Sequence, residues 1–157
     1  MTAWRSSLIF GTQTNDNAAS GIVGEIITAT VVSGSAVALT TTVTANVTSI
    51  SLTTGDWDIT AQVDFLIGAT TSLTQLNSSI SLTTGTLSPQ TGGSGLGTDA
   101  TATANWAAMI PAGNIFQNAG PVRLSISATT TVFLVAQSTF TISTNAAYGT
   151  IRARRMR

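Results

Sequence analysis

The sequence predicts an all-β protein, an antiparallel β-sandwich that is jelly-roll-like and has about eight to nine strands. Three observations lead to this fold class. Apolar and polar residues alternate with a period of two in several segments, as they do in strands that bury one face. Threonine fills 30 of the 157 positions, and β-branched side chains favour strands over helices. Turn signals that contain glycine separate the alternating segments at short intervals, which is typical of sandwiches and jelly rolls.

The clearest strand runs from residue 57 to residue 67. Its apolar side chains fall on one face and its polar side chains on the other, so we expect the apolar face to lie in the core. The apolar face comprises Trp57, Ile59, Ala61, Val63, Phe65 and Ile67. The nine candidate strands span residues 22–32, 37–44, 47–53, 57–67, 73–83, 102–110, 122–128, 131–143 and 148–156.

Two segments predict irregular structure between these strands. Residues 88–97 contain a proline and four glycines, and we expect them to form a projecting surface loop. Residues 114–121 end in Gly120 and Pro121, a pair that usually interrupts a strand, so this segment predicts an irregular connection.

The first 20 residues differ in pattern from the rest of the chain. The apolar residues Trp4, Leu8, Ile9 and Phe10 do not follow the strand period and have no local partner to pack against. The chain length suits one domain. We therefore divide the chain into an N-terminal docking arm, residues 1–20, and one sandwich domain, residues 21–157. The apolar residues of the arm, together with Arg5, are the candidate docking contacts.

Composition argues against an enzyme and against several kinds of partner. The chain has no histidine and no cysteine, so it lacks the usual general base near neutral pH, the thiol nucleophile and the common zinc ligands. We expect no catalytic residue, no metal and no cofactor. The formal net charge is zero, which predicts no binding to nucleic acid or to acidic membranes. No segment approaches the roughly 20 apolar residues of a membrane-spanning helix.

Positive charge is concentrated at the C-terminus, where four of the six arginines occupy the last six positions. In a strand, Arg152 and Arg154 share one face, and Arg155 and Arg157 share the other. We predict that Arg152, Arg154 and Arg155 lie at a subunit interface, because guanidinium groups pair well with carboxylates and main-chain oxygens of a neighbouring subunit. A solvated tail and a cluster that binds nucleic-acid or lipid phosphate are the alternatives.

Three parts of the sequence carry a resemblance to a known family. They are Gly24-Glu25 together with the turn at residues 33–37, the run VTSISLTTGDWD at residues 47–58, and the ending AYGTIRARR at residues 147–155. The sequence resembles a small module found on the virions of tailed bacteriophages, over roughly residues 21–157. The resemblance implies a jelly-roll sandwich that associates as a homotrimer and is a structural component of the virion.

Such modules occur at the ends of tail-fibre chains and as free-standing capsid decoration proteins. Because an arm of about 20 residues precedes the module here in place of a long fibrous shaft, we expect a decoration (cement) protein on the outer surface of the head. This function implies that the chain localises to the virion surface. Its partners would be its own copies and the major capsid protein or another virion protein, with the arm residues as the capsid-docking contacts.

The alternative is a tail-fibre tip module that binds a glycan on the host surface. In that case Trp57, Trp106 and Tyr148 are the candidate stacking platforms for sugar rings. The alternation of residues 57–67 also places Trp57 in the core, so its exposure distinguishes the two interpretations.

Overall fold

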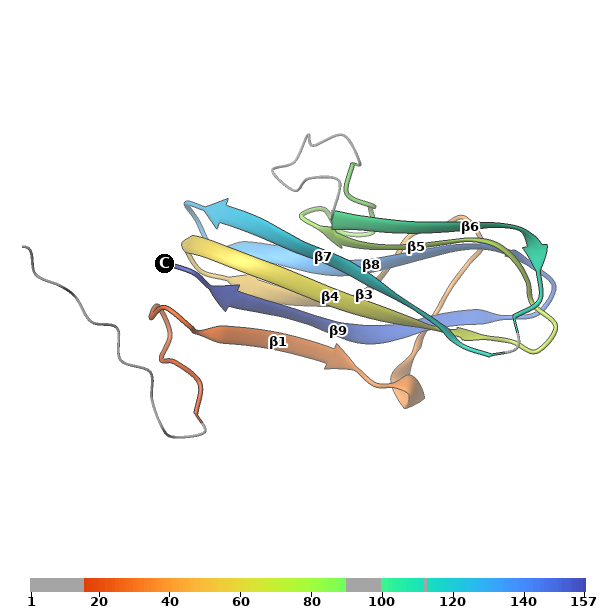
Figure 1. The fold of residues 1–157 in the computed structure, drawn as a ribbon, viewed down its shortest axis with the longest axis horizontal. Coiled ribbons are helices and arrows are strands. Elements are labelled where there is room, and N and C mark those ends of the chain that lie inside the picture. The colour runs from red at the N-terminus through yellow and green to blue at the C-terminus, as the bar shows by residue number, and fades with distance from the viewer. Residues whose placement is uncertain (1–15, 90–99, 112) are drawn as a thin grey trace, which may run out of the picture.

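A computed structural model describes residues 16–89, 100–111 and 113–157, and Figure 1 shows their arrangement. The predicted all-β fold is confirmed, because nine strands form two antiparallel sheets that run along the long axis of the molecule. A 3₁₀ turn, Ser33–Ser35, follows the first strand, and no helix within these ranges is long and apolar enough to cross a membrane. The strands are β1 (Ile26–Val31), β2 (Val37–Ala38), β3 (Ala45–Leu52), β4 (Gly55–Ile67), β5 (Ser72–Ser81), β6 (Thr101–Met109), β7 (Ile115–Ile126), β8 (Thr130–Thr141) and β9 (Asn145–Arg155).

The strand order is that of a jelly roll. Sheet A contains β1, β9, β4 and β7 in that order, with the short β2 also pairing with β9, and sheet B contains β3, β8, β5 and β6. When the eight longer strands are numbered along the chain, the two sheets read 1-8-3-6 and 2-7-4-5. Two four-stranded antiparallel sheets connected in this way make the double-sheet jelly roll.

The core lies between the two sheets and matches the predicted face of β4. Trp57, Ile59, Val63 and Phe65 are fully buried, because their side chains point from sheet A toward sheet B. The largest fully buried side chains are Trp57, Phe65, Leu52, Ile59, Leu73, Leu76, Ile80, Leu134, Ile151, Val63 and Val132.

The outer faces of the two sheets differ. The segment after β5 folds back over sheet B, where Asn46 Nδ2 donates a hydrogen bond to Thr84 Oγ1 at 2.7 Å and the Ser88 N–H donates to Ser79 Oγ at 3.0 Å. Val135, which is in register with both Asn46 and Ser79, is therefore fully buried although it faces away from the core. The outer face of sheet A carries exposed side chains on β1, β4, β7 and β9.

Two predicted elements were wrong. Residues 39–44 do not continue the strand at 37–38, because Thr42 has a positive φ of 64° and the Val43 N–H closes a turn onto Thr40 O. Residues 115–121 are part of β7 and not an irregular connection. The register of β7 against β4 shifts between Ile59 and Ala61, and this bulge accommodates Gly120 and Pro121 inside the strand.

Candidate functional site

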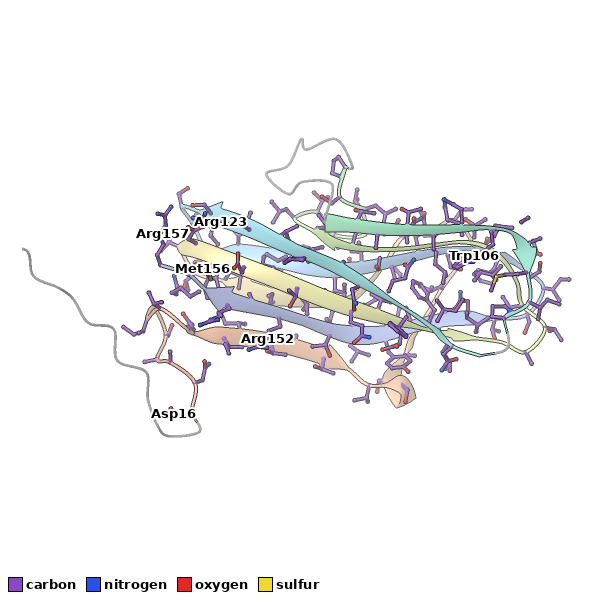
Figure 2. The ribbon with its side chains drawn as sticks, viewed as in Figure 1. Asp16, Trp106, Arg123, Arg152, Met156 and Arg157 are labelled. Carbon is purple, nitrogen blue, oxygen red and sulfur yellow. The ribbon has the colours of Figure 1, made fainter. Side chains whose placement is uncertain are left out.

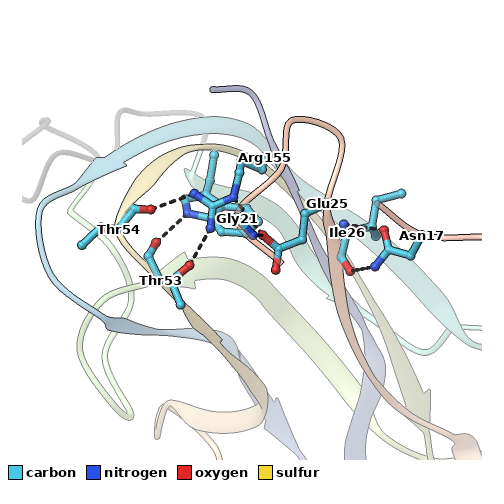
Figure 3. Close-up of polar contacts among 8 residues, drawn as sticks. Asn17, Gly21, Glu25, Ile26, Thr53, Thr54 and Arg155 are labelled. Carbon is cyan, nitrogen blue, oxygen red and sulfur yellow. Dashed lines mark hydrogen bonds and ion pairs between the residues drawn. The ribbon is translucent and has the colours of Figure 1, made fainter. Parts of the chain in front are cut away.

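A buried ion pair joins the segment before β1 to the end of β9 (Figure 3). Arg155 Nε donates a hydrogen bond to Glu25 Oε2 at 2.8 Å, and the two side chains are only 4% and 7% exposed. The same carboxylate oxygen accepts a hydrogen bond from the Gly21 N–H at 2.8 Å. The backbones pair as well, since the Gly24 N–H donates to Arg155 O and the Arg155 N–H donates to Glu25 O. The pair thus fastens the start of the sandwich to its last strand.

The other nitrogens of Arg155 also bond within the chain. Nη1 donates to the Thr54 carbonyl at 2.7 Å, and Nη2 donates to Thr53 Oγ1 at 2.5 Å. The guanidinium carbon lies 4.2 Å from the centroid of the Trp57 ring, a cation–π contact. Gly55 has a φ of +142°, and a Cβ atom there would overlap Arg155 Nη1. The start of β4 therefore has to be glycine for the arginine to fit.

A second ion-pair cluster lies at the same end of the sandwich. The buried Asp56 in β4 accepts hydrogen bonds from Arg123 Nε at 3.0 Å and Nη2, and from Arg157 Nε at 2.7 Å. Both guanidinium groups are largely exposed. Figure 2 shows Arg123, Met156 and Arg157 together where the C-terminus lies. Asp56 thus ties β7 and the C-terminal residues to the start of β4.

Both buried carboxyls stay ionised at neutral pH. Burial on its own raises the pKa of Glu25, but the hydrogen bonds from Gly21 and Arg155 outweigh burial and bring the pKa below the ordinary value of 4.5. The hydrogen bond from Arg123, reinforced by Arg157, lowers the pKa of Asp56 below the ordinary value of 3.8. The contact with Asp56 also raises the pKa of Arg123.

The prediction that Arg155 pairs across a subunit interface was wrong. Its partners Glu25, Thr53 and Thr54 belong to the same chain, and its side chain is buried. Sequence spacing alone does not identify Glu25 as the partner. A signal was present, because the alternation of β9 places Arg155 on the same face as core residues, and a buried guanidinium requires a carboxylate or several acceptors.

Arg152 and Arg154 share one face of β9, as their alternation predicted, and this face is the outer face of sheet A. Both side chains are exposed, and the ion pairs among the described residues involve neither of them. Arg152 lies opposite Thr60, and Arg154 lies opposite Asp58, in the pairing of β9 with β4. A role for these two arginines at a subunit interface stays a prediction.

The outer face of sheet A is hollowed beside Arg152. A depression of about 400 Å³ crosses β9, β4 and β7. Its lining includes Ala61 and Ala119, whose side chains belong to the core, so their backbone forms its floor. Its lining comprises Thr60, Ala61, Gln62, Asn118, Ala119, Gly120, Pro121, Thr150 and Arg152. A smaller depression of about 200 Å³ adjoins it, lined by Asp58, Thr60, Arg152 and Arg154.

The structure does not bring the three candidate glycan-stacking residues together. Trp57 is fully buried and donates its indole N–H to the Thr53 carbonyl at 3.0 Å, so its prediction as a stacking platform was wrong. Trp106 in β6 is half-buried and packs against the core; Figure 2 places it far from Arg152. Tyr148 in β9 is half-buried and lies opposite Asp64.

The candidate docking contacts Trp4, Arg5, Leu8, Ile9 and Phe10 lie outside the described residues. Within the described residues, no group of three acidic side chains is close enough to hold a metal ion. In comparisons with known proteins, no family model, no curated protein and no solved structure matches the chain. The resemblance to a virion module therefore stays a prediction.

Proposed function

We propose that the chain is a non-enzymatic structural protein of a tailed-bacteriophage virion, a homotrimeric decoration protein on the outer surface of the head. The observation that carries the proposal is the strand order of the two sheets. The jelly-roll fold occurs in viral capsid proteins, lectins and cupins. This support is an analogy between folds. The exposed apolar side chains and the paired carboxylates, described below, add to it.

The distribution of exposed apolar residues supports assembly with other proteins. Large exposed hydrophobic side chains gather mainly at the two ends of the sandwich. Those near the C-terminal end are Ile22, Val23 and Met156, and those near the opposite end are Leu66, Ile110, Phe116 and Ile142. Contacts between copies, or with a capsid shell, would remove these side chains from water.

The chemistry of the buried acids supports a structural role over a catalytic one. Glu25 and Asp56 are the buried carboxylates of the described residues, and both accept hydrogen bonds from arginines. A carboxylate with a lowered pKa and charged partners is poorly suited to proton transfer near neutral pH. The two clusters instead hold the segment before β1 and the C-terminal residues against the sandwich.

Asn17, near the end of the docking arm, is bonded to the first residue of β1. Its side chain accepts a hydrogen bond from the Ile26 N–H and donates one to Ile26 O, both at 2.8 Å. These bonds occupy the free edge at the start of β1, so that edge cannot pair with another strand there. The last residues of the arm therefore lie close to the exposed Ile22 and Val23, beside which we place the contact with the capsid.

The proposal is tested by attachment to phage heads. The full chain is purified and mixed with heads of the encoding phage that were assembled without it, and the mixture is sedimented through a sucrose gradient. We expect the full chain to sediment with the heads. A variant that lacks residues 1–15 keeps the Asn17 contact and should stay folded by near-UV circular dichroism, but should remain at the top of the gradient. Attachment of the full chain to purified tails, and not to heads, would contradict the proposal.

A further inference from the structure

The larger depression on sheet A presents an unusual set of polar groups. Gln62 and Asn118 lie opposite each other on β4 and β7, both are exposed, and their side chains make no hydrogen bond to any described residue. Thr60 and Thr150 add hydroxyl groups from β4 and β9. The Thr150 hydroxyl also shares a hydrogen bond of 2.9 Å with Thr30 Oγ1, which leaves it capacity for one more. Because strand pairing fixes the backbone beneath them, these amides and hydroxyls project from a rigid surface.

This lining favours a ligand rich in hydroxyl groups over a protein surface. The centre of a protein interface is usually apolar and aromatic, whereas the side chains around this hollow are mostly threonine, glutamine, asparagine and arginine. Amide side chains both donate and accept hydrogen bonds, which matches the hydroxyl groups of a saccharide. A volume of about 400 Å³ falls within the roughly 300–1,000 Å³ range of small-molecule sites.

Arg152 adds a charge preference to the depression. It lines both hollows, and no ion pair of the described residues engages it. Asp58, the carboxylate that shares the smaller hollow, lies opposite Arg154 and Arg123 in the pairing of the strands. A guanidinium beside an open polar pocket is suited to bind a carboxylate through two parallel hydrogen bonds.

Tyr148 lies outside the lining of the depression but provides an apolar surface further along the same face of β9. It lies on the same face of β9 as Thr150 and Arg152, about 7 Å and about 13 Å away along the strand at the usual rise per residue. Beyond it, Asp64 lies between Tyr148 and Phe116 in register. The apolar face of a sugar ring can pack on such a ring while its hydroxyl groups reach the polar row.

We propose that this depression binds a carboxylate-bearing saccharide. Arg152 holds the carboxylate, Gln62, Asn118 and Thr150 bind ring hydroxyl groups, and Tyr148 packs against a neighbouring sugar ring. The inference goes beyond attachment to a head, because it gives the exposed face of the sandwich a ligand of its own. It assigns Arg152 to this ligand and leaves Arg154 as the candidate for the subunit interface.

The test is isothermal titration calorimetry of the full chain with matched pairs of saccharides. The pairs are trigalacturonic acid with galactotriose, and sialyllactose with lactose. We expect at least one acidic saccharide to bind roughly tenfold or more tightly than its neutral counterpart, since a charge-assisted hydrogen bond contributes about that factor. The absence of any preference for the acidic member in both pairs would overturn the proposal.

Three variants locate the site. Arg152→Gln should weaken the acidic saccharide by roughly tenfold or more, and Gln62→Ala should weaken it without a change in charge. Arg157→Gln, which alters net charge by the same amount at the chain end, should leave binding unchanged.

Equal losses for Arg152→Gln and Arg157→Gln would show nonspecific charge attraction. A smaller particle mass for Arg152→Gln would place the residue at a subunit boundary. Either result overturns the assignment, while the head-attachment experiment separately tests the proposed function.

Discussion

The guanidinium group of Arg155 lies over the indole ring of Trp57, with its central carbon 4.2 Å from the ring centroid. The indole belongs to the core, and the guanidinium covers the ring at the end of the sandwich. There the guanidinium also donates a hydrogen bond to Glu25. The last strand, the start of β4 and the segment before β1 therefore meet at one buried charge. We expect this end of the molecule to respond as a unit to substitution.

Glu25→Gln should destabilise the fold by about 3 kcal/mol or more, because it leaves the buried Arg155 without its counter-charge. The measurement is the free energy of unfolding from urea titration of the full chain. Arg157→Ala is the control, since that guanidinium is 76% exposed and Arg123 still pairs with Asp56 when it is removed. Equal, small changes for both variants would show that the buried pair does not hold this end together.

Stability should fall on the acid side because of Glu25 and Asp56. Both have a folded-state pKa below the ordinary values of 4.5 and 3.8, so the unfolded chain binds protons first as pH decreases. Their stabilisation is complete above those ordinary values and is lost as pH falls through the lower folded-state pKa values. As the pH is lowered from about 7 to about 2.5, the free energy of unfolding should therefore decrease more steeply for the wild type than for the double variant Glu25→Gln, Asp56→Asn. Parallel curves would contradict this account.

Gly55→Ala should destabilise the chain through Arg155. The added Cβ would clash with Nη1, and the residue would keep a positive φ that alanine rarely adopts. We expect a lower melting temperature together with changed near-UV dichroism of the tryptophan region. Gly34→Ala is the matched control, because a Cβ there meets no atom within 4 Å. A Gly55→Ala variant as stable as Gly34→Ala would show that Arg155 is not confined by the turn.

Arg154→Ala should weaken the trimer. If its guanidinium pairs with a neighbouring copy, removal leaves the partner group unsatisfied at the interface, which typically costs a few kcal/mol. Sedimentation equilibrium should give about 48 kDa for the wild type, three chains of 16.0 kDa, and a mass closer to 16.0 kDa for the variant. Arg157→Ala should keep the wild-type mass. A wild type that sediments as a single chain would rule out the trimer.

The fold could be predicted because alternation reports burial directly in strands with one core face, as in β4 from Trp57 to Phe65. The strand boundaries failed where local chemistry was ambiguous. The apolar–polar alternation of residues 37–44 continues through a turn. No sequence pattern indicates the positive φ of Thr42 in that turn. Gly120 and Pro121 indicated a break, but a bulge opposite β4 keeps them in a strand, and only the register between strands shows this.

The candidate site was less predictable, because it depends on which segments meet. The sequence placed Arg155 on one face of a strand correctly, but its partner Glu25 is 130 positions away and comes near only once β9 crosses to pair with β1. The depression beside Arg152 likewise combines β9, β4 and β7. Alternation along one strand assigns Trp57 to the core. The polar hollow depends instead on which strands are neighbours in the sheet, and the spacing of residues along one strand does not show this.

Binding to the outer surface of the head is tested by an electron cryomicroscopy difference map between heads of the encoding phage that contain this protein and heads of a phage from which its gene has been deleted. We predict that the difference density lies outside the shell in groups with three-fold symmetry, and that each lobe fits one two-sheet sandwich. Heads that are identical with and without the gene, or difference density confined to the tail, would contradict the account.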